Sequence, residues 1–124
     1  MDSATRAELK RVFYTGYKVL ACFPAAWLLL FLGFVLRAKL FYPDYFLRND
    51  PKELAMPLHH FLTFWGLVLT FWFSPATFLL TVALFFQARW LALSKYVFLF
   101  LLSALGFYFL VFTDAFDLVS WFLD

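Results

Sequence analysis

Charged residues are scarce in this chain of 124 residues: they make up 15% of it, and ten basic against eight acidic residues leave a net charge of +2. So small and scattered a charge excludes the basic patch of a nucleic-acid-binding protein. Cys22 is the single cysteine, which excludes an intramolecular disulfide and a cysteine-rich metal site. Internal repeats, flexible linkers and low-complexity tracts are also lacking, so we predict one unit over residues 1–124.

Apolar side chains are abundant instead: 65% of the residues are hydrophobic and 25% are aromatic, against about 45–50% apolar residues in an ordinary soluble domain. A soluble domain of this size buries only about 60–70% of its unfolded surface. Large apolar patches would therefore remain in water. The composition predicts an integral membrane protein, whose solvent is the lipid bilayer.

Three uncharged runs are candidate membrane segments, at residues 19–36, 54–88 and 96–113. A helix rises 1.5 Å per residue and needs about 20 residues to cross a hydrocarbon core of about 30 Å. The middle run is long enough for one span, and Ser74-Pro75 inside it predicts a kink. We therefore predict an all-α fold with one long kinked transmembrane helix within residues 54–88.

The first run is marginal in length and contains Pro24 and Gly33, which weaken a helix. Taken locally, it slightly favours a kinked spanning helix. If it spans, Lys and Arg divide six against four between the two sides; if it returns, they divide eight against two. Because positive charge gathers on one side of a membrane, the count favours a re-entrant hairpin over residues 19–41. Residues 1–18 and 42–53 would then share a side.

Residues 1–18 are predicted to form an amphipathic helix on the membrane surface. Thr5 and Glu8 have the spacing of a capping box, and apolar residues recur at helical intervals on the side opposite Arg6 and Lys10. Two acidic residues, and the lack of a small-residue cleavage pattern, argue against a removable signal peptide.

The remaining segments are a loop and a C-terminal helix. Turn-forming Pro, Asn and Asp residues place residues 42–53 in an exposed loop. Residues 96–123 are predicted to form an additional hydrophobic C-terminal helix, with a membrane span over 96–113, because that uncharged stretch would otherwise expose a continuous apolar surface. The acidic residues near its end suggest an interfacial helical turn there.

Two residue pairs are candidates for a chemical site. His59 and His60 could supply a metal or haem ligand, but adjacent helical residues point about 100° apart, so we interpret them as interfacial histidines. Asp114 and Asp117 would share a helical face, as paired acid–base carboxylates can, yet they stand where a helix leaves the membrane. We predict no catalytic residue, no metal site and no cofactor.

The positions of the tryptophan residues indicate which parts of the chain contact protein and which lie at the membrane interface. Trp90 and Trp121 fit an interfacial belt, whereas Trp65 and Trp72 lie seven residues apart on one helical face. Trp72 should fall well inside the middle run, which favours contact with protein rather than lipid.

Five short aromatic-rich motifs follow one another between residues 13 and 96. They are Phe13-Tyr14-Thr15-Gly16; Phe23-Pro24 with Trp27; Pro43-Asp44-Tyr45; Phe64-Trp65 with Val68-Leu69-Thr70 and Trp72; and Arg89-Trp90-Leu91-Ala92-Leu93 with Tyr96. In their order, and in the 22-residue step from Pro43 to Trp65, they resemble the presenilin enhancer subunit of the γ-secretase complex. The resemblance covers about two thirds of the chain.

This resemblance implies a hairpin of two partial helices followed by one full span. It also implies a non-catalytic subunit that binds presenilin, promotes its maturation and stabilises an intramembrane aspartyl protease together with nicastrin and the APH subunit. The implied location is the endoplasmic reticulum, Golgi and plasma membrane. The implied partner-binding residues are Tyr14, Gly16, Pro24, Trp27, Pro43, Tyr45, Phe64, Trp65, Trp72, Arg89, Trp90 and Tyr96.

The chain also departs from that family. Lys95 stands where the family has an acidic residue, Leu99 stands where a Phe is expected, and the tail from Tyr96 is far longer and hydrophobic. Two other functions therefore remain open. One is a structural accessory subunit of a mitochondrial respiratory or ATP-synthase complex, and the other is a haem or quinone anchor that uses His59 or His60.

Overall fold

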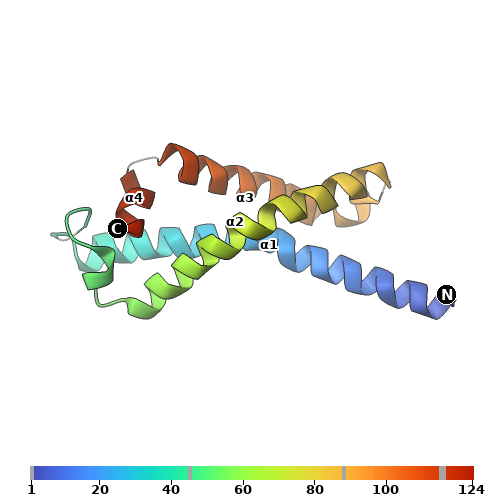
Figure 1. Cartoon of the computed structure of the whole chain (residues 1–124), viewed down its shortest axis with the longest axis horizontal. Helices are drawn as coiled ribbons and strands as arrows, with labels where there is room; N and C mark the ends of the chain where they lie inside the picture. The colour runs from blue at the N-terminus through green and yellow to red at the C-terminus, as the bar shows by residue number, and fades with distance from the viewer. Residues whose placement is uncertain (1, 45, 88, 115–116) are drawn as a thin grey trace.

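The computed structural model describes residues 2–44, 46–87, 89–114 and 117–124. The elements are α1 (Ser3–Phe41), η1 (Pro51–Glu53), α2 (Pro57–Phe86), η2 (Trp90–Leu93), α3 (Ser94–Thr113) and α4 (Leu118–Leu123). The three long helices alternate in direction, and α1 packs against both α2 and α3 (Figure 1). The short helix α4 lies across the end of the bundle that also holds η1.

Among the residues that the structure describes, three helices are long and apolar enough to cross a membrane, in the segments Ser3–Phe41, Pro57–Phe86 and Trp90–Thr113. The chain is thus an all-α protein with three candidate spans, as expected of a multi-pass integral membrane protein. With 39 residues, α1 is about 58 Å long, almost twice the thickness of a hydrocarbon core. Its N-terminal turns therefore extend beyond the end of the bundle that holds η2, as Figure 1 shows.

The re-entrant hairpin predicted over residues 19–41 is not found. One helix continues from Ser3 to Phe41 through Pro24, whose side chain is buried. Proline removes one backbone hydrogen bond, but membrane helices tolerate the loss where neighbouring helices pack against them. Residues 3–18 form the first part of α1, so the helix predicted there is found but is not a separate element. They and residues 42–53 consequently lie at opposite ends of the bundle (Figure 1).

The helices pack through positions that are mostly three or four residues apart. The buried positions of α1 are Tyr17, Ala21, Pro24, Trp27, Phe31, Phe34 and Ala38, and those of α2 are Thr63, Thr70, Ser74, Thr77, Thr81 and Leu84. This spacing is typical of left-handed helix bundles. The large side chains of α1 thus meet small hydroxyl side chains on α2, and small residues are what membrane helices use to approach closely.

The long helix predicted within residues 54–88 is found as α2, with Pro75 inside it. The additional membrane helix predicted from the uncharged run 96–113 is found as α3, and the helical turn predicted after it is found as α4, so residues 96–123 are not one continuous helix. Helix α3 ends at Thr113, its C-cap residue Asp114 has a left-handed backbone (φ 45°), and α4 begins at Leu118. An Asp tolerates this conformation better than most residues, which explains why the chain turns there rather than continuing as one helix.

Asp114 also holds α4 in place. Its Oδ1 atom accepts hydrogen bonds from the backbone N–H groups of Val119 (2.8 Å) and Ser120 (3.0 Å), and its Oδ2 accepts from the Ser120 hydroxyl. The indole of Trp121 donates to the carbonyl of Asn49 (2.8 Å). Fully buried Phe122 closes the core beneath α4. The carboxylate of Asp114 thereby links the end of α3 to α4, which covers one end of the bundle.

Acidification is expected to release α4. The Ser120 hydroxyl, with the backbone N–H groups of Ser120 and Val119, holds the pKa of Asp114 below its ordinary value. The carboxylate therefore stabilises docking above the unfolded pKa of about 4 and stops doing so as the pH falls through its folded value. The hydrogen-exchange protection of the Val119 amide should fall in that window. Asp114→Asn, which caps without titrating, should remove this pH dependence; an unchanged loss of protection would contradict the assignment.

Candidate functional site

Trp27 lies at the centre of the bundle and joins all three long helices. Its ring stacks on Phe31 (4.9 Å between centroids), meets Phe107 of α3 edge-on (4.9 Å) and donates from Nε1 to the Thr63 carbonyl of α2 (3.1 Å). Only 1% of the side chain is exposed. The family resemblance implies that Trp27 binds a partner, but here the chain's own helices enclose it.

Gly66 is a packing residue that the sequence analysis missed. A Cβ atom added to Gly66 would lie 3.2 Å from Cδ1 of Trp27, so the indole packs directly against the backbone of α2. The signal that could have revealed this interface is the hydroxyl spacing of Thr63, Thr70, Thr77 and Thr81 on α2, which marks the side of the helix that faces its neighbours.

The opposite side of α2 presents large apolar side chains outward. We define the α2 outer face by residues at intervals of seven, all of them exposed: Leu58, Trp65, Trp72, Leu79 and Phe86. Phe64 is also partly exposed beside them. Trp72 stands near the middle of the helix with 73% of its side chain exposed. The sequence prediction that Trp65 and Trp72 share one face is confirmed.

A groove of about 540 Å³ separates α2 from α3 and adjoins the α2 outer face. Its lining includes Ser74, Pro75 and Leu79 from α2, and Ala104 and Tyr108 from α3. Leu79 belongs to both the groove and the outer face. We call the outer face and this groove together the α2 surface.

Two buried hydroxyl groups of α2 lack a hydrogen-bond partner, and one of them belongs to Ser74, which lines this groove. In the described part of the chain, neither Thr70 nor Ser74 finds a partner for its hydroxyl oxygen. The other buried hydroxyl groups of α2, on Thr63, Thr77 and Thr81, each donate to the carbonyl four residues earlier at 2.8 Å. The hydroxyl groups of Thr70 and Ser74 can therefore still form a hydrogen bond, whereas those of the other three residues already make one.

Four other residues implied by the resemblance gather at the end of the bundle that holds η2. Tyr14, Trp90 and Tyr96 pack around the same buried cluster of α1, α2 and α3, and Trp90 also stacks on Phe85 (5.2 Å). Arg89 is exposed and lines a groove together with Tyr14. Residues far apart in the sequence are thus brought together here.

The remaining implied residues are not brought together. Gly16 is exposed, and an added Cβ would meet nothing within 4 Å. Pro43 is exposed at the far end of the molecule. Tyr45 lies outside the described residues, and the prediction made for it stays a prediction.

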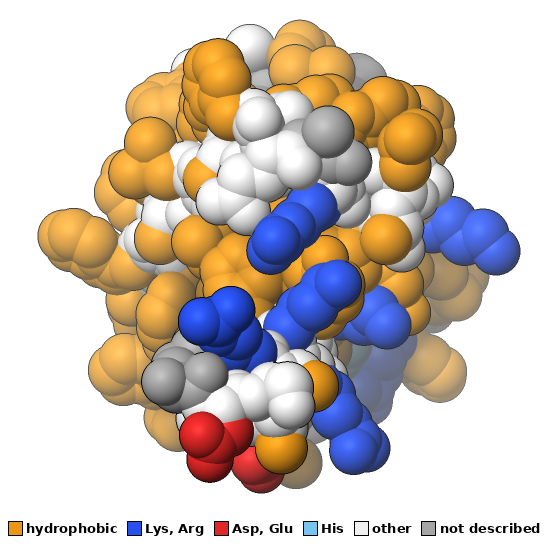
Figure 2. Space-filling model, turned by 90° about the vertical axis from the view of Figure 1, so that its right-hand side faces the viewer, with side chains coloured by type: hydrophobic (Ala, Val, Ile, Leu, Met, Phe, Trp, Pro, Cys, Tyr) orange, Lys and Arg blue, Asp and Glu red, His pale blue; other side chains and the backbone are white. Residues whose placement is uncertain are grey.

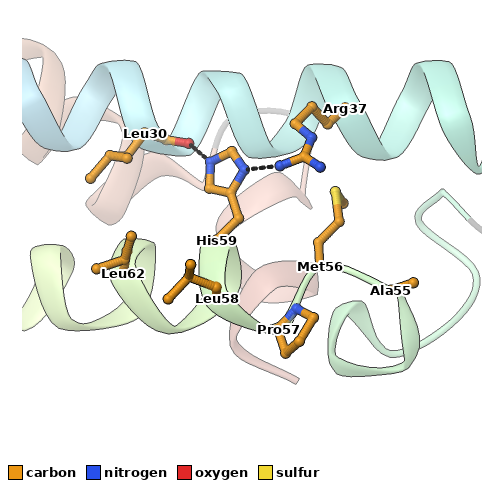
Figure 3. Close-up of a pocket in the computed structure, with 8 residues that line it drawn as sticks. All are labelled: Leu30, Arg37, Ala55, Met56, Pro57, Leu58, His59 and Leu62. Carbon is orange, nitrogen blue, oxygen red and sulfur yellow. Dashed lines mark hydrogen bonds between the residues drawn. The ribbon is translucent and has the colours of Figure 1, made fainter.

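His59 is held between α1 and α2 by both of its ring nitrogens (Figure 3). A carbonyl can only accept, so Nε2 donates to the carbonyl of Leu30 (2.9 Å), and Nδ1 is left to accept from Nη1 of Arg37 (3.1 Å). His60 donates from Nε2 to the carbonyl of Phe122 (3.3 Å). Both ring nitrogens of His59, and Nε2 of His60, are therefore occupied by hydrogen bonds in this arrangement.

A pocket of about 450 Å³ beside His59 is lined mostly by apolar side chains, among them Met56, Leu58 and Leu62 (Figure 3). Within the described ranges, no group of three or more His, Cys, Asp or Glu side chains could hold a metal ion. Asp114, weighed above as half of a carboxylate pair, caps α4. The α2 surface is therefore the best candidate functional site.

Comparisons with models of protein families, with curated proteins and with solved structures give no match. What the fold defines is the class: a small all-α protein with three membrane-length apolar helices, organised as a multi-pass membrane protein. No family is assigned by these comparisons.

Proposed function

We propose that this chain is a non-catalytic subunit of a membrane protein complex and that it binds a transmembrane helix of its partner on the α2 surface. The observation that carries the proposal is the position of Trp72, which is 73% exposed near the middle of a candidate span. Tryptophan at a lipid surface prefers the membrane interface, where its N–H reaches polar groups.

Lipid tails offer no acceptor to an indole N–H at mid-span, whereas a partner helix can offer both an acceptor and a shape that fits the ring. The neighbouring groove adds the small side chains Ser74 and Ala104, and small residues let membrane helices approach closely. A Ser or Thr hydroxyl can also bond across a helix interface. A partner helix on the α2 surface would therefore satisfy several unmet requirements at once.

The partner named by the sequence resemblance is presenilin. We propose that the complex is γ-secretase, with nicastrin and the APH subunit, in the endoplasmic reticulum, Golgi and plasma membrane, and that binding promotes presenilin maturation. The five ordered motifs support this choice, and two of their residues, Trp65 and Trp72, lie on the α2 surface. The span formed by α3 does not follow from the resemblance, and Trp27 would act on assembly only through the fold.

The proposal predicts which proteins accompany the chain. A tagged chain, isolated in a mild detergent from cells that express it naturally, should carry presenilin, nicastrin and the APH subunit in comparable amounts. Depleting the chain should leave presenilin largely unprocessed. Isolation with subunits of a respiratory or ATP-synthase complex would instead establish the accessory role and refute the presenilin assignment. Mass spectrometry of the isolated complex decides between them.

A further inference from the structure

The two ends of the bundle differ in charge. Six basic and two acidic residues lie toward the end that holds the N-terminus and η2, a net charge of +4, and four basic and six acidic residues lie toward the other end, a net charge of −2. The six basic residues are Arg6, Lys10, Arg11, Lys18, Arg89 and Lys95. Figure 2 shows this end of the molecule, where Lys and Arg side chains gather.

A groove of about 550 Å³ opens at this end between the first half of α1 and the link from α2 to η2. Its lining consists of Arg6, Leu9, Lys10, Phe13, Tyr14, Gln87 and Arg89. Three of these side chains are cationic. The Nζ atom of Lys10 lies 5.5 Å from the centre of the Tyr14 ring, a cation–π contact that orients the amine beside the groove. The groove is thus lined by basic side chains together with the apolar side chains of Leu9 and Phe13.

The groove lies where the apolar spans meet water. The uncharged run of α1 begins at Val19, and that of α2 ends just before Arg89, so Gln87 and Arg89 stand at the membrane boundary. No acidic residue occurs between residues 54 and 113. The acidic residues nearest to Arg6 and Lys10 in the sequence are Asp2, which precedes the first turn of α1, and Glu8. Residues two positions apart on a helix point about 200° apart, so Glu8 faces away from the side that carries Arg6 and Lys10.

We propose that this groove binds the headgroup of an anionic phospholipid, with Arg6, Lys10 and Arg89 around the phosphate and Leu9 and Phe13 against the apolar part of the lipid. Two features of the groove favour this occupant: its positive charge and its position at the membrane boundary. The anionic groups found at that boundary are lipid headgroups. With three spans, the six-to-four division of Lys and Arg places this end on the cytoplasmic side, whose leaflet carries anionic lipid. The inference is independent of the partner protein proposed above.

The test measures lipid retention by the purified full chain. Native mass spectrometry in detergent would compare phosphatidylglycerol with phosphatidylcholine carrying the same acyl chains, so that only the headgroup differs. Each basic residue near a membrane surface strengthens binding of anionic lipid about five-fold. Phosphatidylglycerol should bind at least about 25-fold more tightly than phosphatidylcholine, and the difference should shrink as salt rises.

A matched pair of variants locates the site. Arg6→Gln with Arg89→Gln removes two exposed charges from the groove, and Lys39→Gln with Arg48→Gln removes two exposed charges from the opposite end. The first pair should weaken phosphatidylglycerol binding roughly 25-fold, and the second should leave it within about two-fold. All four positions are exposed, so both variants keep the helix seam. Equal losses in the two variants, or equal retention of the two lipids, would overturn the proposal.

Discussion

Replacing Trp27 with alanine is expected to destabilise the bundle by about 3–5 kcal/mol, the cost of truncating a large aromatic residue in a packed core. The indole contacts Phe31, Phe107 and the carbonyl of Thr63, so its loss leaves a cavity where three helices meet. Unfolding of the purified protein in detergent micelles with increasing denaturant would measure the change. We expect it to exceed that of any other single tryptophan substitution in the chain.

The matched control is Trp65→Ala. Trp65 is exposed on α2, so this substitution removes the same kind of side chain from a position outside the core. It should change the free energy of unfolding by no more than about 0.5 kcal/mol, as surface substitutions usually do. Trp27→Phe should fall between the two, since it keeps an aromatic ring but loses the hydrogen bond to Thr63. Similar destabilisation by Trp27→Ala and Trp65→Ala would show that Trp27 is not the centre of the fold.

Composition and the lengths of the uncharged runs were enough to predict an all-α membrane protein and the long helix α2. They could not predict the path of residues 19–41. The charge count assumed that the sharper asymmetry marks the true topology, although a division of six against four also satisfies the positive-inside tendency. Pro24 weakens an isolated helix, but its effect depends on neighbouring helices, which a local reading of the sequence does not supply.

The sequence analysis also did not recognise the inner side of α2. In water a buried seam is apolar, but in lipid the contact seam favours small and hydroxyl residues while apolar residues face outward. Thr63, Thr70 and Ser74 are accordingly buried, whereas Leu79 and Trp72 are exposed. The spacing of the hydroxyls was present in the sequence, and reading it required the lipid rule instead of the aqueous one.

The tryptophans show a second limit. Trp27 and Trp72 both lie deep in uncharged runs, and their local sequences are similarly aromatic. Which of them is internal depends on how α1 is rotated against α2 and α3, and that rotation is set by packing across the whole seam. The sequence could therefore identify aromatic residues suited to protein contact, but it could not separate those that hold the fold from those available to a partner.

Replacing Trp65 and Trp72 together by alanine is expected to reduce recovery of the partner complex at least about ten-fold while leaving the fold intact. Both side chains lie on the α2 outer face and outside the buried seam. Truncating a central tryptophan at an interface commonly costs about 2 kcal/mol or more. The measurement is the amount of partner that is isolated with equal amounts of tagged variant and unaltered chain, with denaturant unfolding as the check on the fold.

The control for this double variant is Phe98→Ala with Phe112→Ala, which removes two exposed aromatic residues from α3. Neither lines the groove between α2 and α3, so partner recovery should stay within about two-fold of the unaltered chain. This comparison separates a specific surface from a general need for aromatic residues facing lipid. If the α3 variant loses the partner and the α2 variant keeps it, the partner binds on the other side of the bundle, and the mid-span position of Trp72 then has a different cause.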